Sequence, residues 1–210
     1  RPHLIIGSPM CTMLSQLQSF GVWTEEKLRK YREAKGDIQF MVEVYNHQVD
    51  EGLWFLHEHP ATATSLSLPM MQKLAGREGV KMSVADQCMY GLGEEDDAGD
   101  VNPVMKPTGV MTNSSVPARM LGRRCDGGHR RTRLEGNNSK GEVRTRNAQQ
   151  YPIGLTRAIV EGMRKQIEHD QAGLQVLCNF ESGEGKRLMS RPAEEEDNSD
   201  KVFWKAFGDV

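Results

Sequence analysis

Three apolar segments of the chain each lead to a side chain that can do chemistry. "LIIG" runs through a Gly-Ser-Pro turn to Cys11, "LWFLHEHP" contains Glu58, and "VKMSVADQ" leads to Cys88. A thiolate is a nucleophile, and a carboxyl group can hold or move a proton, so the two together are typical of covalent catalysis with acid–base support. The alternative for Cys11 is a small buried hydrophobe, which is what free cysteine often is.

The elements that must position these residues follow from the hydrophobic pattern. Apolar runs bounded by turn residues predict strands, and spacings of three and four predict helices. Strands alternating with helices predict an α/β fold with a doubly wound, mostly parallel sheet, in which ligands bind at the carboxyl ends of the strands. Cys11, Glu58 and Cys88 would then meet at one edge. We expect strands at 3–7, 53–60, 80–91 and 109–114, and helices at 25–52, 66–79, 116–124 and 151–170, with Gly36 as a possible break in the first helix.

Composition limits the class of protein. The chain has 210 residues, a net charge of −2 and 37% hydrophobic residues. It holds no apolar run of about 18 residues and no signal-peptide pattern, so we expect neither a membrane partner nor secretion. The four cysteines are widely spaced without a Cys-x-x-Cys pair, which predicts reduced thiols in an intracellular protein, nuclear or cytoplasmic. The abrupt start, without Met, predicts that a longer polypeptide continues upstream.

Two regions depart from this pattern. We expect an α/β domain over residues 1–170, interrupted by a disordered basic loop at 119–148, and a largely irregular tail over 171–210. Clustered arginines can neutralise phosphates without reading sequence, so the loop predicts DNA contact, and its alternative is a solvated loop. The candidate nucleic-acid-binding residues are Arg119, Arg123, Arg124, Arg130, Arg131 and Arg133.

Several of these segments resemble one family. "LIIGSPMCTMLSQLQ" is similar to the cysteine loop of C5-cytosine DNA methyltransferases, which carries Ser-Pro-Pro-Cys after a strand. "WFLHEHP" resembles their next strand, which ends in Glu-Asn, and "VADQCMYG" and "KPTGVMTNS" are similar to segments of phage-type members. The order matches over roughly residues 3 to 130. The His-Glu-His-Pro form is also similar to polyproteins of mobile elements.

The resemblance implies a class I methyltransferase-like Rossmann fold and a set of roles. In the family a cysteine thiolate adds to C6 of a flipped cytosine, a glutamate holds the N3 edge, and S-adenosylmethionine supplies the methyl group. Cys11 would be the nucleophile and Glu58 the N3 partner. The expected substrate-binding residues are Ser8 and Pro9, which would shape the loop, and Thr108 and Asn113, which would lie near the base or its phosphates.

The departures from the family are as informative. Met10 replaces the second proline, His59 replaces the usual Asn, and no Gly-rich cofactor loop precedes the cysteine strand. The sequence therefore predicts a divergent, N-terminally truncated methyltransferase-like domain that transfers methyl groups to cytosine in DNA only when complete. The alternative is a non-catalytic nucleic-acid-binding module of a mobile-element polyprotein.

Other chemistry is weaker in the sequence. His57 and His59 alternate on a strand and would share one face, with Glu58 on the other, so we interpret them as packed against helices and not as ligands. Cys125 and His129 resemble half of a metal site, but no second pair accompanies them, and we predict no metal. A cysteine hydrolase would need an oxyanion arrangement beside Cys11, for which the sequence offers no signal.

Overall fold

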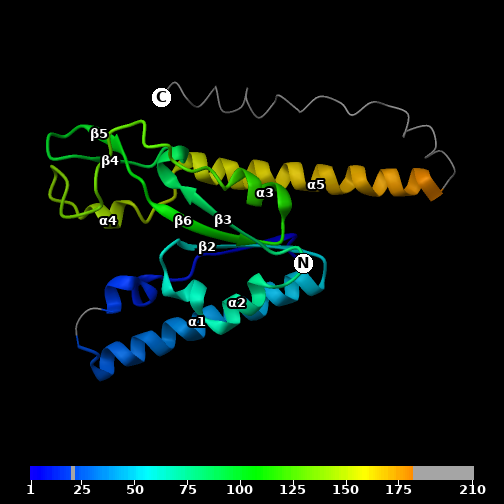
Figure 1. Ribbon diagram of the computed structural model, residues 1–210, viewed down its shortest axis with the longest axis horizontal. Coiled ribbons are helices and arrows are strands. Elements are labelled where there is room, and N and C mark those ends of the chain that lie inside the picture. Colours follow the sequence, from blue (N-terminus) through cyan, green and yellow to red (C-terminus); the bar gives the residue numbers. More distant parts are fainter. Residues whose placement is uncertain (20–21, 182–210) are drawn as a thin grey trace. The chain divides into compact units, whose positions relative to one another are not determined.

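The computed structural model describes residues 1–19 and 22–181. The chain divides into a first unit, Arg1–Ile167, and a second unit, Glu168–Val210. At the centre of the first unit is a four-stranded sheet in the order β1-β2-β6-β3, and a separate hairpin pairs β4 with β5 (Figure 1). The strands are β1 Leu4–Gly7, β2 Trp54–Pro60, β3 Lys81–Asp86, β4 Gly93–Glu95, β5 Val101–Pro103 and β6 Pro107–Thr112.

The sheet is mixed, which corrects the expectation of a doubly wound, mostly parallel sheet. β1 runs parallel to β2, but β6 is antiparallel to both of its neighbours, β2 and β3. A parallel connection needs a crossover that returns the chain to the other end of the sheet. Between β3 and β6 the chain instead forms the β4–β5 hairpin, and Pro107 re-enters the sheet opposite Asp86. The fold combines helices and strands, as expected, but two of the three pairings in the four-stranded sheet are antiparallel.

This topology still gathers three strand ends. Because β2 and β3 both run against β6, they are parallel to each other and to β1. Gly7, Pro60 and Asp86 therefore end their strands on the side where Pro107 begins β6. We refer to this side, marked by these four residues, as the carboxyl edge.

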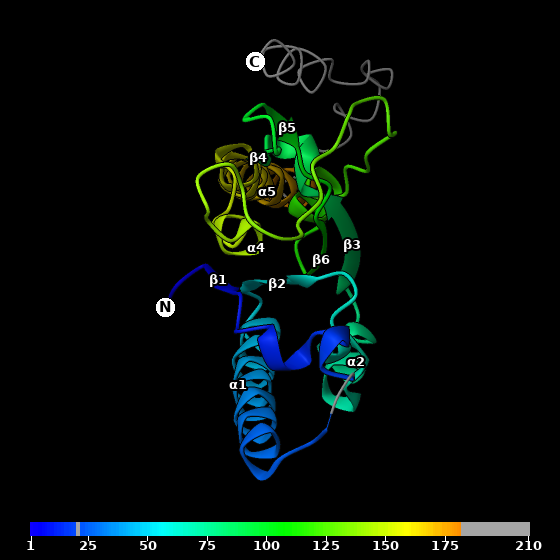
Figure 2. The ribbon, with the colours of Figure 1, turned by 90° about the vertical axis from the view of Figure 1, so that its left-hand side faces the viewer.

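One face of the sheet is covered by helices α1 and α2 (Figures 1 and 2). α1 spans Glu25–Asp50 and begins at Thr24, whose Oγ1 accepts from the Lys27 backbone N–H at 3.2 Å. α1 is continuous through Gly36, because the buried stripe on either side of that glycine outweighs the roughly 1 kcal/mol that a helical glycine costs. α2 spans Pro69–Ala75. The core on this face contains Leu14, Ile38, Tyr45, Phe55, Met71, Leu74 and Met111.

The other face is covered by α3 (Ser115–Met120) and by the first part of α5 (Ile153–Glu181). Gln166 of α5 fixes the start of α3, since its Oε1 accepts from Ser114 Oγ at 3.0 Å and from the Val116 backbone N–H at 2.9 Å. α5 continues beyond residue 170, where we expected an irregular tail to begin, and residues 182–210 of that tail lie outside the described residues. The short helices are η1 Thr12–Leu14, η2 Gln16–Ser19, η3 Thr64–Ser67, η4 Gln87–Tyr90 and α4 Arg144–Asn147.

The basic segment at 119–148 is ordered, which corrects the expectation of a disordered loop. The segment lies against the acidic β4–β5 hairpin, which supplies carboxylates to its cations. Asn138 adds a polar anchor, because its side-chain amide donates to the buried Glu94 Oε1 at 3.3 Å. Three ion pairs join the two, at Arg130–Asp96 (3.2 Å), Lys140–Glu95 (2.6 Å) and Arg144–Asp97 (2.7 Å).

Within residues 1–19 and 22–181, no helix combines the length and the apolar character that a membrane crossing requires.

Candidate functional site at the carboxyl edge

Glu58 is a buried carboxylate near the end of β2. Alternate residues of a strand point to opposite faces, so Glu58 faces away from the α1 side, to which Phe55 and His57 belong. Only 5% of Glu58 is exposed. Its Oε2 accepts two hydrogen bonds, from Ser8 Oγ at 2.7 Å and from Tyr151 OH at 2.8 Å, while its Oε1 is buried without a partner among the described residues. One oxygen of this carboxylate therefore accepts two hydrogen bonds, and the other accepts none from the described residues.

Cys11 lies half-buried in the turn between β1 and η1, at the same edge. Burial raises the pKa of its thiol, and the Glu58 carboxylate raises that pKa further. A backbone hydrogen bond and the ammonium of Lys106 act in the opposite direction on the pKa of Cys11. The structure thus brings the thiol within electrostatic reach of both Glu58 and Lys106, and it favours the protonated thiol in the ligand-free state.

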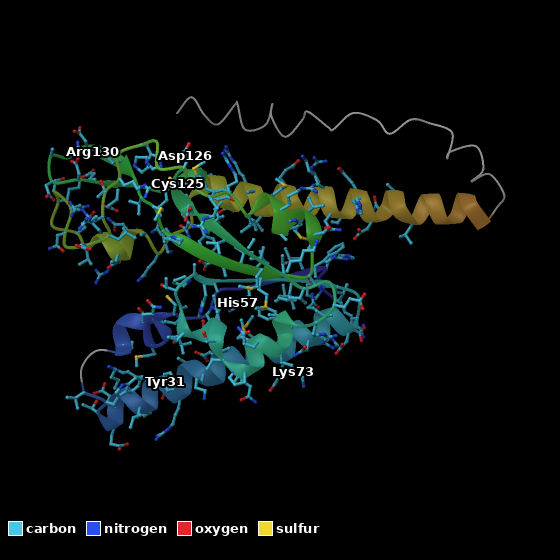
Figure 3. All side chains as sticks on the ribbon, in the orientation of Figure 1. Tyr31, His57, Lys73, Cys125, Asp126 and Arg130 are labelled. Atoms are coloured by element: carbon cyan, nitrogen blue, oxygen red, sulfur yellow. The ribbon has the colours of Figure 1, made fainter. Side chains whose placement is uncertain are left out.

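His57 and His59 lie together on the α1 side of β2, with ring centroids 4.9 Å apart (Figure 3 labels His57). Burial, and then the neighbouring His59, lowers the pKa of His57 to about 3. His59 Nε2 donates to the Pro9 carbonyl at 2.8 Å, and its Nδ1 accepts from Ser65 Oγ at 2.5 Å. His57 Nδ1 lies 3.1 Å from the Tyr45 hydroxyl, while its Nε2 is buried without a partner among the described residues. His59 fixes the loop that carries Cys11.

The other predicted substrate-binding residues lie at two different ends of the sheet. Pro9 holds the cysteine loop, and Thr108 lies buried where β6 begins at the carboxyl edge, with its Oγ1 accepting from Gln87 Nε2 at 2.8 Å. Asn113 is at the opposite end of the sheet, which corrects the expectation that it lies near the base. Its side chain caps the start of β2 through Phe55 N–H at 2.9 Å and Leu53 C=O at 2.8 Å. The two residues flank opposite ends of β6, and because β6 is antiparallel to β2, Thr108 and not Asn113 lies at the carboxyl edge.

Two residues of the site were not singled out from the sequence. Tyr151 donates to a carboxylate that is 93 residues away along the chain, and no local pattern could indicate this contact. Burial and the charge of Glu58 raise the pKa of the Tyr151 phenol, which therefore stays a hydrogen-bond donor at neutral pH. Lys106 precedes Pro107 in the quoted "KPTGVMTNS" segment, and its Nζ also donates to the Ala148 carbonyl at 2.9 Å. That segment was the one signal that could have pointed to Lys106.

The candidate nucleic-acid-binding arginines are partly used inside the protein. Arg124 pairs with the buried Asp86 at 2.8 Å, and Arg130 pairs with Asp96. Arg123 is half-buried, donates to the Met89 carbonyl at 3.1 Å and lies over the Tyr90 ring. The side chains that remain exposed to solvent belong to Arg119, Arg124, Arg130, Arg131 and Arg133.

Comparison with family models, with curated proteins and with solved structures found no match for this chain. The function of the chain is therefore inferred from its side chains.

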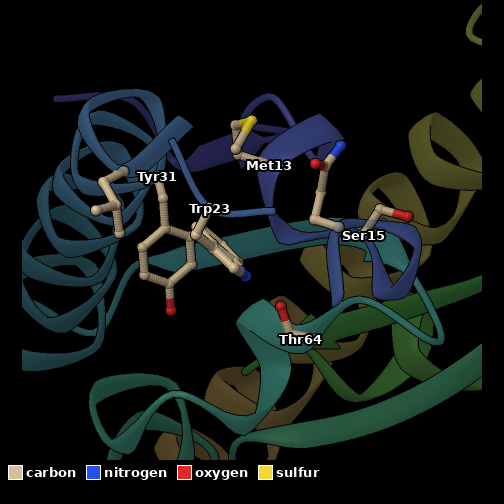
Figure 4. A pocket seen from close by; sticks show the side chains of 7 residues that line it. Met13, Ser15, Trp23, Tyr31 and Thr64 are labelled. Atoms are coloured by element: carbon tan, nitrogen blue, oxygen red, sulfur yellow. The ribbon is translucent and has the colours of Figure 1, made fainter. Parts of the chain in front are cut away.

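A cavity of about 370 Å³ opens away from these residues, between the η1–η2 segment and α1 (Figure 4). Trp23 and Tyr31 form one side of it and contact each other edge to face, with ring centroids 5.5 Å apart. Met13 and Thr64 line other parts of the wall. None of the predicted catalytic or substrate-binding residues lines this cavity.

Proposed function

We propose that the carboxyl edge at Cys11 and Glu58 receives a pyrimidine base from DNA and adds the Cys11 thiolate to it, as the C5-cytosine methyltransferase resemblance implies. The observation that carries this proposal is the Glu58 carboxylate. One of its oxygens is held by Ser8 and Tyr151, while the other is buried without a partner among the described residues, at the same edge as a cysteine. A carboxylate oxygen left in this state suits a ligand that presents a hydrogen-bond donor.

Glu58 has the chemistry to hold the polar edge of a cytosine. Its open Oε1 can accept a hydrogen from an exocyclic amino group or, once protonated, donate to a ring nitrogen. The hydroxyls of Ser8 and Tyr151 keep the carboxyl group from rotating. Positioning of this kind is what brings a reacting ring within hydrogen-bond reach of its acid.

Cys11 supplies the bond-forming step. Its sulfur must first lose its proton to solvent, because burial and Glu58 both raise the pKa of the thiol. The sulfur–C6 bond then forms as the C5–C6 double bond opens, and protonation at N3 by Glu58 accommodates the displaced electrons. Protonated Glu58 no longer carries the charge that opposes the thiolate, and the Lys106 ammonium favours it. Elimination of the cysteine reverses the step.

S-adenosylmethionine does not fit the residues around this turn. The glycine after the first strand, Gly7, has no open space beside it, since a Cβ there would collide with the side chains of Tyr45 and Met41. Ser8 and Pro9 are already engaged by Glu58 and His59. The proposed reaction therefore consists only of the reversible addition of Cys11 to the base.

A second function is favoured by a different observation. The structure favours a protonated Cys11, while several arginines remain exposed along residues 119–133. A domain that binds DNA without acting on it needs only these cations, because phosphate contacts supply sequence-independent affinity. This second function corresponds to the alternative from the sequence, a non-catalytic nucleic-acid-binding module of a mobile-element polyprotein.

A covalent trap separates the two functions. DNA carrying 2-pyrimidinone in place of cytosine accepts a thiolate at C6 without any methyl donor. We expect a denaturation-resistant adduct with the full chain, absent from Cys11→Ser and retained in the matched control Cys178→Ser. No adduct, together with salt-dependent retention of the same DNA, would replace the first function by the second. Neither adduct nor retention would contradict both.

A further inference from the structure

A second group of chemically active side chains lies at the end of β3. Cys88 is in η4, and Cys125 and His129 are in the loop that follows α3 (Figure 3 labels Cys125). Their ligand atoms all lie within 4.8 Å of one another. We propose that Cys88 Sγ, Cys125 Sγ and His129 Nε2 bind one Zn²⁺ ion, with the fourth tetrahedral position open to water or a ligand. The local sequence shows no second pair for Cys125 and His129, and the fold supplies Cys88.

The imidazole of His129 is oriented as a metal ligand should be. Its Nδ1 lies 3.0 Å from the Arg130 carbonyl, and a carbonyl only accepts, so the ring proton resides on Nδ1. Nε2 therefore carries a lone pair, and this lone pair faces Cys125 Sγ at 3.2 Å. A backbone acceptor on the far nitrogen is the usual outer contact of a zinc-bound histidine, because it fixes both tautomer and ring orientation.

The sulfur of Cys125 is surrounded by donors that favour a thiolate. The Gly127 backbone N–H donates to it at 3.4 Å, and Arg131 Nη2 donates at 3.2 Å. Gly127 has φ +84°, a conformation that side-chain-bearing residues rarely adopt, and this turn directs its N–H back to the sulfur. These contacts also lower the pKa of Cys125, with the Gly127 N–H as the largest cause.

Asp86 fixes the loop before any metal arrives. Its Oδ2 accepts from the Cys125 backbone N–H at 2.8 Å and from Arg124 Nε at 2.8 Å, and its own backbone N–H donates to the Arg123 carbonyl at 2.9 Å. Only 1% of Asp86 is exposed, so these bonds are protected from water. Asp86 is two residues before Cys88, so it ties the loop that bears Cys125 to the segment that bears the other thiol.

The ligand types select the ion. Thiolate and imidazole bind Zn²⁺ in tetrahedral sites, whereas Mg²⁺ and Ca²⁺ prefer oxygen. Zn–S of about 2.3 Å and Zn–N of about 2.0 Å place tetrahedral donor atoms about 3.6–3.8 Å apart. Cys125 Sγ and His129 Nε2, at 3.2 Å, therefore need to separate by about 0.4 Å. Cys88 and Cys125 each release a proton to solvent on binding, and the two thiolates neutralise the dication.

The site is tested on the full chain, made metal-free with a chelator and kept reduced. Cobalt(II) is added as a spectroscopic probe, and Zn²⁺ is titrated against a chromophoric chelator. We expect one ion per chain, a thiolate-to-cobalt charge-transfer band and the visible bands of a tetrahedral site. Zn²⁺ should also protect Cys88 and Cys125, but not Cys11, from alkylation.

Variants locate the ion. Cys88→Ser, Cys125→Ser and His129→Asn should each weaken Zn²⁺ binding by more than the roughly 10- to 100-fold that loss of a supporting contact costs. Cys178→Ser and His47→Asn are matched controls and should bind as the parent does. Absence of the charge-transfer band in the parent chain overturns the site even if a variant fails to fold. If the protein is isolated with a Cys88–Cys125 disulfide and the reduced protein still binds no metal, the proposed site is wrong as well. The outcome does not depend on the DNA trap.

Discussion

Two cysteines at one edge of the same sheet have opposite surroundings. Cys11 lies in a turn that contacts Glu58 through Ser8 and His59 through Pro9, and burial is the largest cause of its raised pKa. Cys125 lies in a loop, where the Gly127 N–H and the Arg131 guanidinium act directly on its sulfur and lower its pKa. The comparison shows that position at a strand end does not by itself make a thiol reactive.

The difference lies in what each backbone can offer. The turn that carries Cys11 uses Ser8 and Pro9 to hold Glu58 and His59, so its polar groups are directed at the sheet. The loop that carries Cys125 has a left-handed glycine and directs an N–H at the sulfur itself. The Cys11 turn is suited to a ligand that itself supplies a hydrogen-bond donor to Glu58. The Cys125 loop is suited to a cation.

The largest expected effect is a loss of stability at low pH, which measures how strongly His57 is shielded from water below the Cys11 turn. Burial lowers the pKa of His57 from 6.5 to about 3. The unfolded chain therefore binds a proton that the folded chain does not, and stability that is complete above pH 6.5 is lost as the pH falls toward 3. The unfolded imidazole is half protonated at pH 6.5 and the loss approaches about 1.4 kcal/mol per pH unit only below that value, so the free energy of unfolding should fall by about 1.6 kcal/mol between pH 6.5 and 5.0 on account of His57.

Urea unfolding of the parent chain and of His57→Gln at both pH values measures this loss. The difference between the two pH values should shrink in His57→Gln and stay unchanged in His47→Gln, which alters an exposed histidine of α1. An equal difference in all three proteins would show that His57 is accessible to water in the folded state.

The next effect compares the two thiols directly. Alkylating reagents attack thiolates, so the rate follows the thiolate fraction at a given pH. In metal-free, reduced protein at pH 7.5, Cys125 should react with iodoacetamide at least about tenfold faster than Cys11. Peptide mass spectrometry after timed labelling gives both rates in one sample. Equal rates would mean that the surroundings of the two sulfurs do not differ as described.

The smallest effect isolates the influence of Glu58 on Cys11. Because the carboxylate raises the pKa of the thiol, Glu58→Gln should increase the labelling rate of Cys11 by about two- to threefold. Lys106→Met should decrease it, since the ammonium lowers the same pKa. Glu78→Gln, at an exposed carboxylate after α2, serves as the control. An unchanged rate in both Glu58→Gln and Lys106→Met would place the thiol out of their electrostatic reach.

Much of the local structure could be predicted. The Gly-Ser-Pro turn, the Thr24 cap and the spacing of apolar residues gave β1, α1 and β2 nearly at their observed limits. These signals are local, so one sequence is enough to read them. The contact of Tyr151 with Glu58 could not be predicted, because it joins segments 93 residues apart.

The alternation of β2 was also predictable, and the structure has His57 and His59 on one face and Glu58 on the other. The direction of β6 was not, because its apolar run reads the same in either orientation. That direction decided that Thr108, and not Asn113, lies at the carboxyl edge. The order of the basic segment likewise depended on a partner elsewhere in the chain, the acidic β4–β5 hairpin.

The sequence by itself determined which residues could do chemistry and which of them would end a strand, because both are properties of residue type and short-range spacing. Only the tertiary structure decided their partners. It placed two hydroxyl donors on one oxygen of Glu58 and left the other oxygen without a partner among the described residues. It also brought Cys88 to Cys125 and His129, whose own loop contains no further thiol ligand. Proximity, burial and charge set the chemistry of a side chain, and all three arise from residues that are distant along the chain.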